Sequence, residues 1–174
     1  DGSRLLLSWR YVSRCVLIGK SPLAITDALE ANKVAGGGIF LHYDNISEKS
    51  ADVFVNVEVG NTSASAAQPT VTVVVKDKSG KRIKSVTKKI KIGAKSSATA
   101  YLAMKLKNPE LWSPESPYLY NVEISVMQSG KSVDGGMVRM GIRKAEFRGK
   151  DGFWLNGKPY HQLVGGNRHQ DFAT

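Results

Sequence analysis

The stretch Ala51-Asp52-Val53-Phe54-Val55-Asn56-Val57-Glu58-Val59 alternates between aliphatic and other side chains. Because successive side chains of a strand point to opposite faces, its four valines share one face. Alternation of this kind predicts a strand that is half buried against a core. The turn-forming residues Gly60-Asn61-Thr62-Ser63 then close the run.

Similar short runs recur on both sides of this stretch, separated by turn residues and without a convincing amphipathic helix between them. They are Ile39 to Tyr43, Val71 to Val75, Ile83 to Ile92, Ser97 to Leu106, Tyr118 to Met127 and Val133 to Ile142. The run from Ile83 to Ile92 carries Ile83, Val86, Ile90 and Ile92, and in the run from Ser97 to Leu106 the side chains expected to point inward are Tyr101, Ala103 and Met104. About seven such runs predict an all-β fold, an immunoglobulin-like antiparallel β-sandwich.

Composition is that of a soluble globular protein, with 41% hydrophobic and 23% charged residues in a chain of 174. Cys15 is the only cysteine, which excludes an internal disulfide and a thiolate metal site built from this chain alone. The apolar runs are too short for a transmembrane helix, and no intact signal peptide is present. Neither a cofactor nor a membrane partner is expected.

The formal net charge of +10 comes largely from lysines between Lys76 and Lys107. They are Lys78, Lys81, Lys84, Lys88, Lys89, Lys91 and Lys95, spaced among apolar residues as in strands. We interpret them as a solvated outer face that also discourages edge-to-edge aggregation. Nucleic acid is not an expected partner, because no aromatic residues interleave with the lysines.

Three short patterns with chemical potential have simpler explanations. Ser85-Val86-Thr87-Lys88 matches a Ser-x-x-Lys pattern but falls in a strand. Gly36-Gly37-Gly38 could cradle a phosphate, but no helix follows to supply amide donors. The histidines His42, His161 and His169 lack the spacing of metal ligands.

The C-terminal part begins with Phe153-Trp154-Leu155-Asn156-Gly157-Lys158-Pro159, in which Asn-Gly predicts a two-residue hairpin turn. An extended run from His161 to Gly166 follows and ends in a polar cluster, formed by Asn167, Arg168, His169 and Asp171. In barrels that open at their C-terminal face, the functional residues lie at such strand ends. The cluster is therefore a candidate site at the opening of a larger domain, although a polar loop is the simpler explanation.

A second aromatic segment, Leu111-Trp112-Ser113-Pro114-Glu115-Ser116-Pro117-Tyr118-Leu119-Tyr120, contains two prolines among large apolar residues. Prolines fix the backbone, and Trp112 can close the end of the sandwich before the next strand begins. We expect this structural role. If the aromatic rings were exposed instead, the segment would resemble a sugar-binding or protein-binding loop.

Together these motifs resemble the family 2 glycoside hydrolases, the family of β-galactosidase, β-glucuronidase and β-mannosidase. The resemblance is carried by Leu111 to Tyr120, by Gly141-Ile142-Arg143, where the family usually has Gly-Phe-Arg, by Phe153 to Pro159, and by Gly165 to Asp171. A weaker match, Arg14 to Ile18, is similar to the end of the family's sugar-binding jelly roll.

The resemblance implies a parent enzyme of carbohydrate metabolism with a jelly roll, a sandwich and a (β/α)₈ catalytic barrel. Residues 1–20 would then end the jelly roll or be an expression remnant. Residues 21–146 would form the sandwich, and 147–174 a linker hairpin and the first strand of a truncated TIM barrel. The two catalytic glutamates of this retaining family stand roughly 5 Å apart on later strands. This fragment is therefore expected to be an inactive part of a β-galactosidase-like glycosidase.

In the parent, the resemblance implies that His169 contacts the carbohydrate substrate and that Arg168 and Asp171 organise the site, while Asn167 orients the turn. Gln170 stands where many β-galactosidases carry an acid, so the preferred sugar stays open, as does the oligomeric state. Relatives that degrade polysaccharides are often exported, which favours a periplasmic or secreted location over the cytoplasm. An alternative function is that of a carbohydrate-binding or protein-interaction module of immunoglobulin-like fold.

Overall fold

The structure, a computed structural model, describes residues 19–27, 31 and 37–161. The strands are β1 Leu23–Ile25, β2 Ile39–Asp44, β3 Ser50–Asn61, β4 Thr70–Lys76, β5 Arg82–Lys89, β6 Ser96–Lys107, β7 Tyr120–Gln128, β8 Lys131–Met140, β9 Ala145–Phe147, β10 Phe153–Leu155 and β11 Lys158–Pro159. The helical content of these residues is a single 3₁₀ turn, η1 Gly149–Asp151. The described part therefore contains no helix able to cross a bilayer.

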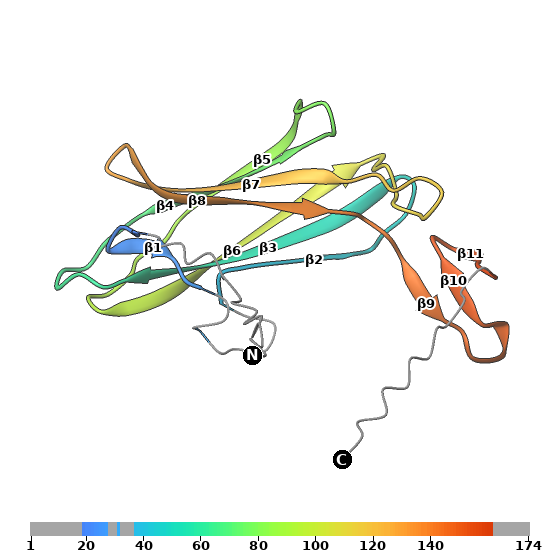
Figure 1. Cartoon of the computed structure of the whole chain (residues 1–174), viewed down its shortest axis with the longest axis horizontal. Coiled ribbons are helices and arrows are strands. Elements are labelled where there is room, and N and C mark those ends of the chain that lie inside the picture. The colour runs from blue at the N-terminus through green and yellow to red at the C-terminus, as the bar shows by residue number, and fades with distance from the viewer. Residues whose placement is uncertain (1–18, 28–30, 32–36, 162–174) are drawn as a thin grey trace, which may run out of the picture.

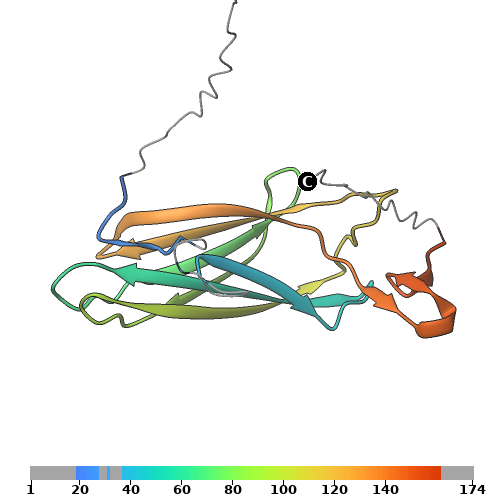
Figure 2. The same cartoon turned by 60° about the horizontal axis from the view of Figure 1, so that its bottom comes forward.

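Two antiparallel sheets face one another as the layers of a sandwich, which Figures 1 and 2 show from two directions. In the first sheet β3 is central. Strand β6 pairs with one edge of β3 along its whole length, and β2 and β1 pair with successive segments of its other edge. The second sheet has the order β5-β4-β7-β8. A small third sheet, β9-β10-β11, projects from one end of the sandwich. The predicted all-β immunoglobulin-like sandwich is confirmed.

The core lies between the two large sheets and is built by alternating side chains. The four valines of the opening stretch, in β3, are fully buried, as are those of the facing strand β4, Val71, Val73 and Val75. Strands β6 and β7 add side chains from their inner faces, namely Ala100, Leu102, Met104, Leu106, Tyr120, Val122, Ile124 and Val126. Since full burial of a valine or leucine stabilises a fold by about 1.5–3 kcal/mol, these positions hold the sandwich together.

The predicted orientation of β6 was wrong for two residues. Tyr101 and Ala103 face solvent, with Tyr101 65% exposed, while Met104 points inward as predicted. A shift of one residue moves every side chain of a strand to its other face, and Lys105 is on the same face as Tyr101. Ile83 is 45% exposed because it lies on the outer face of the edge strand β5.

The lysine-rich strand β5 forms one edge of the second sheet and is exposed along almost all of its length. Lys84 and Lys88 pair with the buried residues Val75 and Val71, so they lie on the side of β5 that faces the core. Both nevertheless reach solvent past the edge of the opposite sheet. Charges that point inward at an edge strand hinder another strand from pairing there, so these two lysines are solvated but do not lie on the predicted outer face.

Candidate functional site

The polar cluster predicted as a substrate site, Asn167, Arg168, His169 and Asp171, lies outside the described residues, as do the run Gln162 to Gly166 and Arg14 to Ile18. Of the predicted histidines, His42 and His161 are described, and both are exposed. Within the described residues, no group of three His, Cys, Asp or Glu side chains is arranged to hold a metal. The candidate site that the structure does show lies upstream of the cluster.

The two other chemical patterns are not assembled into sites. Ser85 and Lys88 point to opposite faces of β5, and the Lys88 ammonium donates a hydrogen bond to the Tyr101 carbonyl at 3.2 Å. Gly38, with φ of +58°, donates its N–H to the Thr26 hydroxyl at 2.9 Å and leads directly into strand β2. Gly36 lies outside the described residues; in the part that is described, Ser85 and Lys88 are not paired, and a strand follows Gly38 where a phosphate cradle would need a helix.

Three of the motifs that carried the family resemblance meet at the end of the sandwich from which β9 leaves. The Trp112 backbone N–H donates to the Ile142 carbonyl at 2.7 Å, and the Asn156 side-chain amide donates to the Trp112 carbonyl at 3.1 Å. We call this site the junction and define it by Tyr43, Trp112, Gly141, Ile142, Arg143, Lys144 and Asn156. It brings together residues that are up to 44 positions apart along these three motifs.

The Trp112 ring packs close to Gly141 of the second motif. A side chain on Gly141 would place its Cβ 3.0 Å from the indole ring and 3.1 Å from the Leu119 side chain, so any other residue here forces these neighbours to shift. The Arg143 guanidinium lies 5.1 Å from the centroid of the ring, close enough for a cation–π interaction. Trp112 is half-buried in this position, which supports the predicted structural role.

The remaining aromatic residues of the segment also turn toward the protein. Tyr118 and Tyr120 meet edge to face with ring centroids 4.9 Å apart, and the Tyr120 hydroxyl accepts a hydrogen bond from the Glu110 N–H at 2.8 Å. Burial raises the pKa of the Tyr120 phenol above its ordinary value. These rings do not form the exposed platform that a sugar-binding loop would need.

Asn156 connects the hairpin to both other motifs. It and Gly157 have φ of +52° and +78°, and Leu155 pairs with Lys158, which confirms the predicted two-residue turn. The Asn156 backbone N–H donates to the Lys144 carbonyl at 2.8 Å, and its side-chain Oδ1 accepts from the Lys144 N–H at 2.9 Å. With the bond to Trp112, one side chain fixes β9, β10 and the Pro-rich segment together.

Tyr43, at the end of β2, adds a contact that sequence reasoning missed. Its hydroxyl donates to the Gly141 carbonyl at 2.9 Å and so links the first sheet to the point where the chain leaves the second. The two residues are 98 positions apart in the sequence. The only local signal was an aromatic residue at the end of a strand, and this does not identify its partner.

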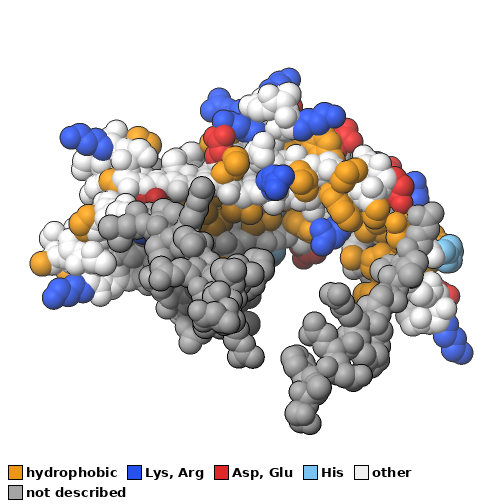
Figure 3. All heavy atoms as spheres, viewed as in Figure 1, with side chains coloured by type: hydrophobic (Ala, Val, Ile, Leu, Met, Phe, Trp, Pro, Cys, Tyr) orange, Lys and Arg blue, Asp and Glu red, His pale blue; other side chains and the backbone are white. Residues whose placement is uncertain are grey.

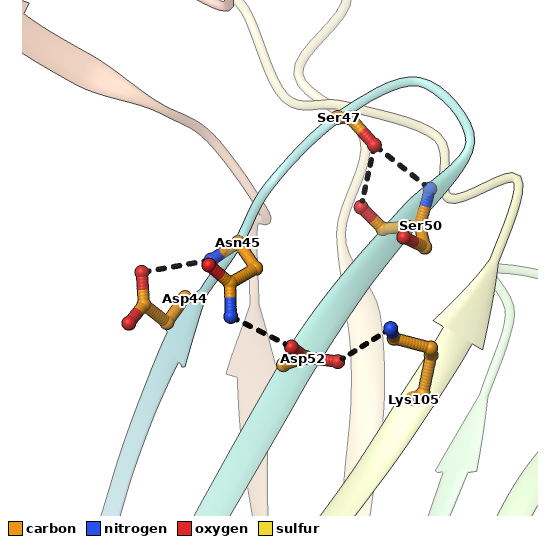
Figure 4. Close-up of polar contacts among 6 residues, drawn as sticks. All are labelled: Asp44, Asn45, Ser47, Ser50, Asp52 and Lys105. Carbon is orange, nitrogen blue, oxygen red and sulfur yellow. Dashed lines mark hydrogen bonds and ion pairs between the residues drawn. The ribbon is translucent and has the colours of Figure 1, made fainter.

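The turn between β2 and β3 lies beside the junction, and Figure 4 shows the polar contacts of this turn. The Asn45 side chain donates to Asp52 at 2.9 Å, Lys105 lies 3.5 Å from the same carboxylate, and the Ser47 hydroxyl both donates to and accepts from the Ser50 backbone at 3.1 Å. The Asn45 hydrogen bond, assisted by Lys105, holds the pKa of Asp52 below its usual range. This turn and the hairpin border a hollow of about 380 Å³, lined by Ile46, Ser47, Glu48, Lys49, Leu111, Lys144, Asn156 and Gly157.

A second hollow, of about 550 Å³, lies beside the first between the Pro-rich segment and the hairpin; Glu48, Leu111 and Asn156 border both. Across it the Tyr160 hydroxyl donates to Glu115 Oε1 at 3.1 Å. Hydrogen bonds from its own N–H and from the Ser113 hydroxyl lower the pKa of Glu115, so the acceptor is an anion. The contact fixes the chain where it leaves the described hairpin. The geometry of the whole site therefore serves to position the polypeptide.

Comparison with known proteins agrees with the motifs that meet here. The family model "Glycosyl hydrolases family 2" matches residues 37–143, more than half of the chain. The chain belongs to this family. The match covers the Pro-rich segment and Gly141 to Arg143, and the hairpin, Phe153 to Pro159, lies beyond its end. The resemblance inferred from the motifs is thus confirmed.

This family 2 sandwich is similar to parts of much longer proteins. It is 32% identical over 137 residues to a β-glucuronidase of Formosa agariphila, which is 79% of this chain and 14% of that protein. It is 42% identical over 69 residues to a β-galactosidase of Thermoanaerobacter pseudethanolicus, 40% of this chain and 9% of that protein. A solved structure of Bacteroides uniformis β-glucuronidase 2 aligns with a TM-score of 0.75 at 28% identity, over 86% of this chain and 18% of that one. The chain therefore spans less than a quarter of the length of these proteins.

Proposed function

We propose that this chain is the non-catalytic sandwich region of a retaining glycosidase, whose complete polypeptide hydrolyses O-glycosidic bonds of a carbohydrate. Family membership supports the proposal, as does the similarity to proteins named β-glucuronidase and β-galactosidase. Retaining hydrolysis uses two carboxylates about 5 Å apart. We assign both to the part of the enzyme beyond this chain, so the chain by itself is expected to be inactive.

The role of the sandwich in this enzyme is to brace the start of the catalytic barrel. The observation that carries this proposal is the position of Asn156, which ties the hairpin to the Pro-rich segment through Trp112 and to β9 through Lys144. The chain then passes Tyr160, which is fixed by Glu115, and continues toward the polar cluster. Residues that contact substrate need positions held to within a fraction of an ångström, which a rigid support provides.

Within the polar cluster we assign substrate contact to His169. Arg168 and Asp171 organise the site around it, and Asn167 orients the turn. These roles follow from the family motif that the sequence carries at Gly165 to Asp171.

A panel of nitrophenyl glycosides tests the proposal. The β-galactoside, β-glucuronide and β-mannoside are incubated with the 174-residue chain and, in parallel, with the protein extended to the length of its relatives. We expect nitrophenol release from the extended protein alone, and the sugar that reacts identifies the substrate class. Release by the 174-residue chain, or by neither protein with any of the three sugars, would contradict the proposal.

A further inference from the structure

The small sheet β9-β10-β11 has two unlike faces. On one face, Glu146 forms ion pairs with Lys144 at 3.1 Å and Arg148 at 2.8 Å, and the Arg148 guanidinium lies 3.9 Å from the centroid of the Trp154 ring. This face has its charges paired and its indole covered. The other face carries Phe147, Phe153 and Tyr160.

We call these three residues the aromatic row. Phe147 and Phe153 are direct cross-strand partners with ring centroids 5.0 Å apart, and the Tyr160 N–H donates to the Phe153 carbonyl, with ring centroids 6.1 Å apart. The row thus runs from β9 across β10 to the residue that follows β11. One end is fixed by the bond from Tyr160 to Glu115, while at the other end Phe147 is 83% exposed.

A surface of this kind indicates a missing contact. The sheet has strands of three, three and two residues, and sheets this small need packing against another element for stability. Leu155, on the same face as the row, is only 7% exposed, so the sandwich covers the end of that face near the turn; Phe153 and Tyr160 are half-buried, and Phe147 is left open. Figure 3 shows hydrophobic side chains reaching the surface at this end of the molecule. The exposed Phe147 ring, with the half-buried Phe153 beside it, leaves apolar surface uncovered here, and exposed apolar patches are typical of interaction sites.

We propose that the aromatic row is the docking surface for the domain that follows this chain in the same polypeptide. This inference rests on the proposed function, because it requires such a domain. The chain leaves the hairpin immediately after Tyr160, so whatever follows in the sequence starts beside the row. A partner on the same chain and this close has a very high effective concentration, which favours it over a separate molecule. The relatives, of which this chain spans less than a quarter, have ample length for that domain.

Thiol labelling measures whether the row is covered. Phe147→Cys is made in a Cys15→Ser background, so that the introduced thiol is the only one. The rate of maleimide labelling is compared between the 174-residue chain and the extended protein. Met137→Cys is the matched control, because Met137 is 63% exposed and lies on the outer face of the second sandwich sheet. Hydroxyl-radical footprinting of unsubstituted Phe147 repeats the comparison without any substitution.

We expect Phe147→Cys to react as fast as the control in the 174-residue chain and at least about tenfold slower in the extended protein, as a buried site does. Met137→Cys should react equally in both. Equal labelling of Phe147→Cys in both proteins would overturn the inference. So would protection that appears in the 174-residue chain as its concentration rises, because the occupant would then be a second copy.

The glycoside panel, run on the same preparations, separates this inference from the proposed function. An active extended protein with an unprotected Phe147→Cys site contradicts the docking inference alone. An inactive extended protein in which the site is protected supports docking and contradicts the glycosidase proposal.

Discussion

Replacing Asn156 with alanine tests the central contact of the junction. Alanine removes two side-chain hydrogen bonds, to the Lys144 N–H and the Trp112 carbonyl, worth about 0.5–1.5 kcal/mol each. Residue 156 has φ of +52°, a left-handed conformation that asparagine tolerates through local hydrogen bonds of its side chain. Alanine cannot make these bonds, and holding it in this conformation costs about 1–2 kcal/mol. Together the local free energy of opening of the small sheet falls by about 2–5 kcal/mol. Asn156→Gly keeps the turn conformation and should lose only the first part, about 1–3 kcal/mol.

Native-state hydrogen exchange of the Tyr160 amide, which bonds to Phe153, reads out this local opening. Since each 1.4 kcal/mol changes a population tenfold, exchange should become at least roughly thirtyfold faster in Asn156→Ala. The amide of Val55, at the centre of β3, should keep its rate in all variants. Unchanged exchange at Tyr160 in the alanine variant would refute the role of Asn156. Equal effects of glycine and alanine would refute the contribution of the left-handed turn conformation.

Three further predictions follow from the packing of the sandwich. Gly141→Ala should lower the free energy of unfolding by about 1–3 kcal/mol through overpacking against Trp112; a denaturant titration that shows no loss would contradict this contact. Leu102→Ala should cost about 2–5 kcal/mol, whereas Tyr101→Ala should stay within about 0.5 kcal/mol, and the reverse order would show that β6 faces the other way. The pKa of Tyr120 is raised in the folded state, so its contribution is fully present below about pH 10 and is lost as the pH rises further; Tyr120→Phe should remove this part of the alkaline loss, measured as the free energy of unfolding against pH.

Local patterns in the sequence were sufficient for most of the strands and for the hairpin turn. From Val53 to Val59 one phase is entirely valine and the other, apart from Phe54, is polar, so the inner face could be assigned. In β6 both phases contain apolar residues. The series with Tyr101 and Ala103 was predicted to face inward, although the longer apolar series with Leu102 and Met104 is the buried one. The exposed phase continues from Tyr101 through Ala103 to Lys105 and Lys107, and those lysines would have identified it.

The junction could be predicted only as separate motifs. Each motif was recognisable from its own residues, but the hydrogen bonds that join Asn156 to Trp112 and Tyr43 to Gly141 span 44 and 98 residues. Periodicity describes which face a side chain occupies and carries no information about a partner so far away. The aromatic row was missed for the same reason, because Phe147 and Tyr160 come together only when the third sheet forms.

The lysines along the open edge of β5 give the domain a characteristic response to ionic strength. Two copies that approach edge to edge bring Lys84 and Lys88 of each molecule together, and their repulsion acts over about 8 Å at physiological salt. Added salt shortens this range, so the colloidal stability of the domain should fall as salt rises. A polyanion-binding protein behaves in the opposite sense, since salt releases it from its complexes. The dependence of solubility on salt should therefore distinguish repulsion between edges from binding of a polyanion.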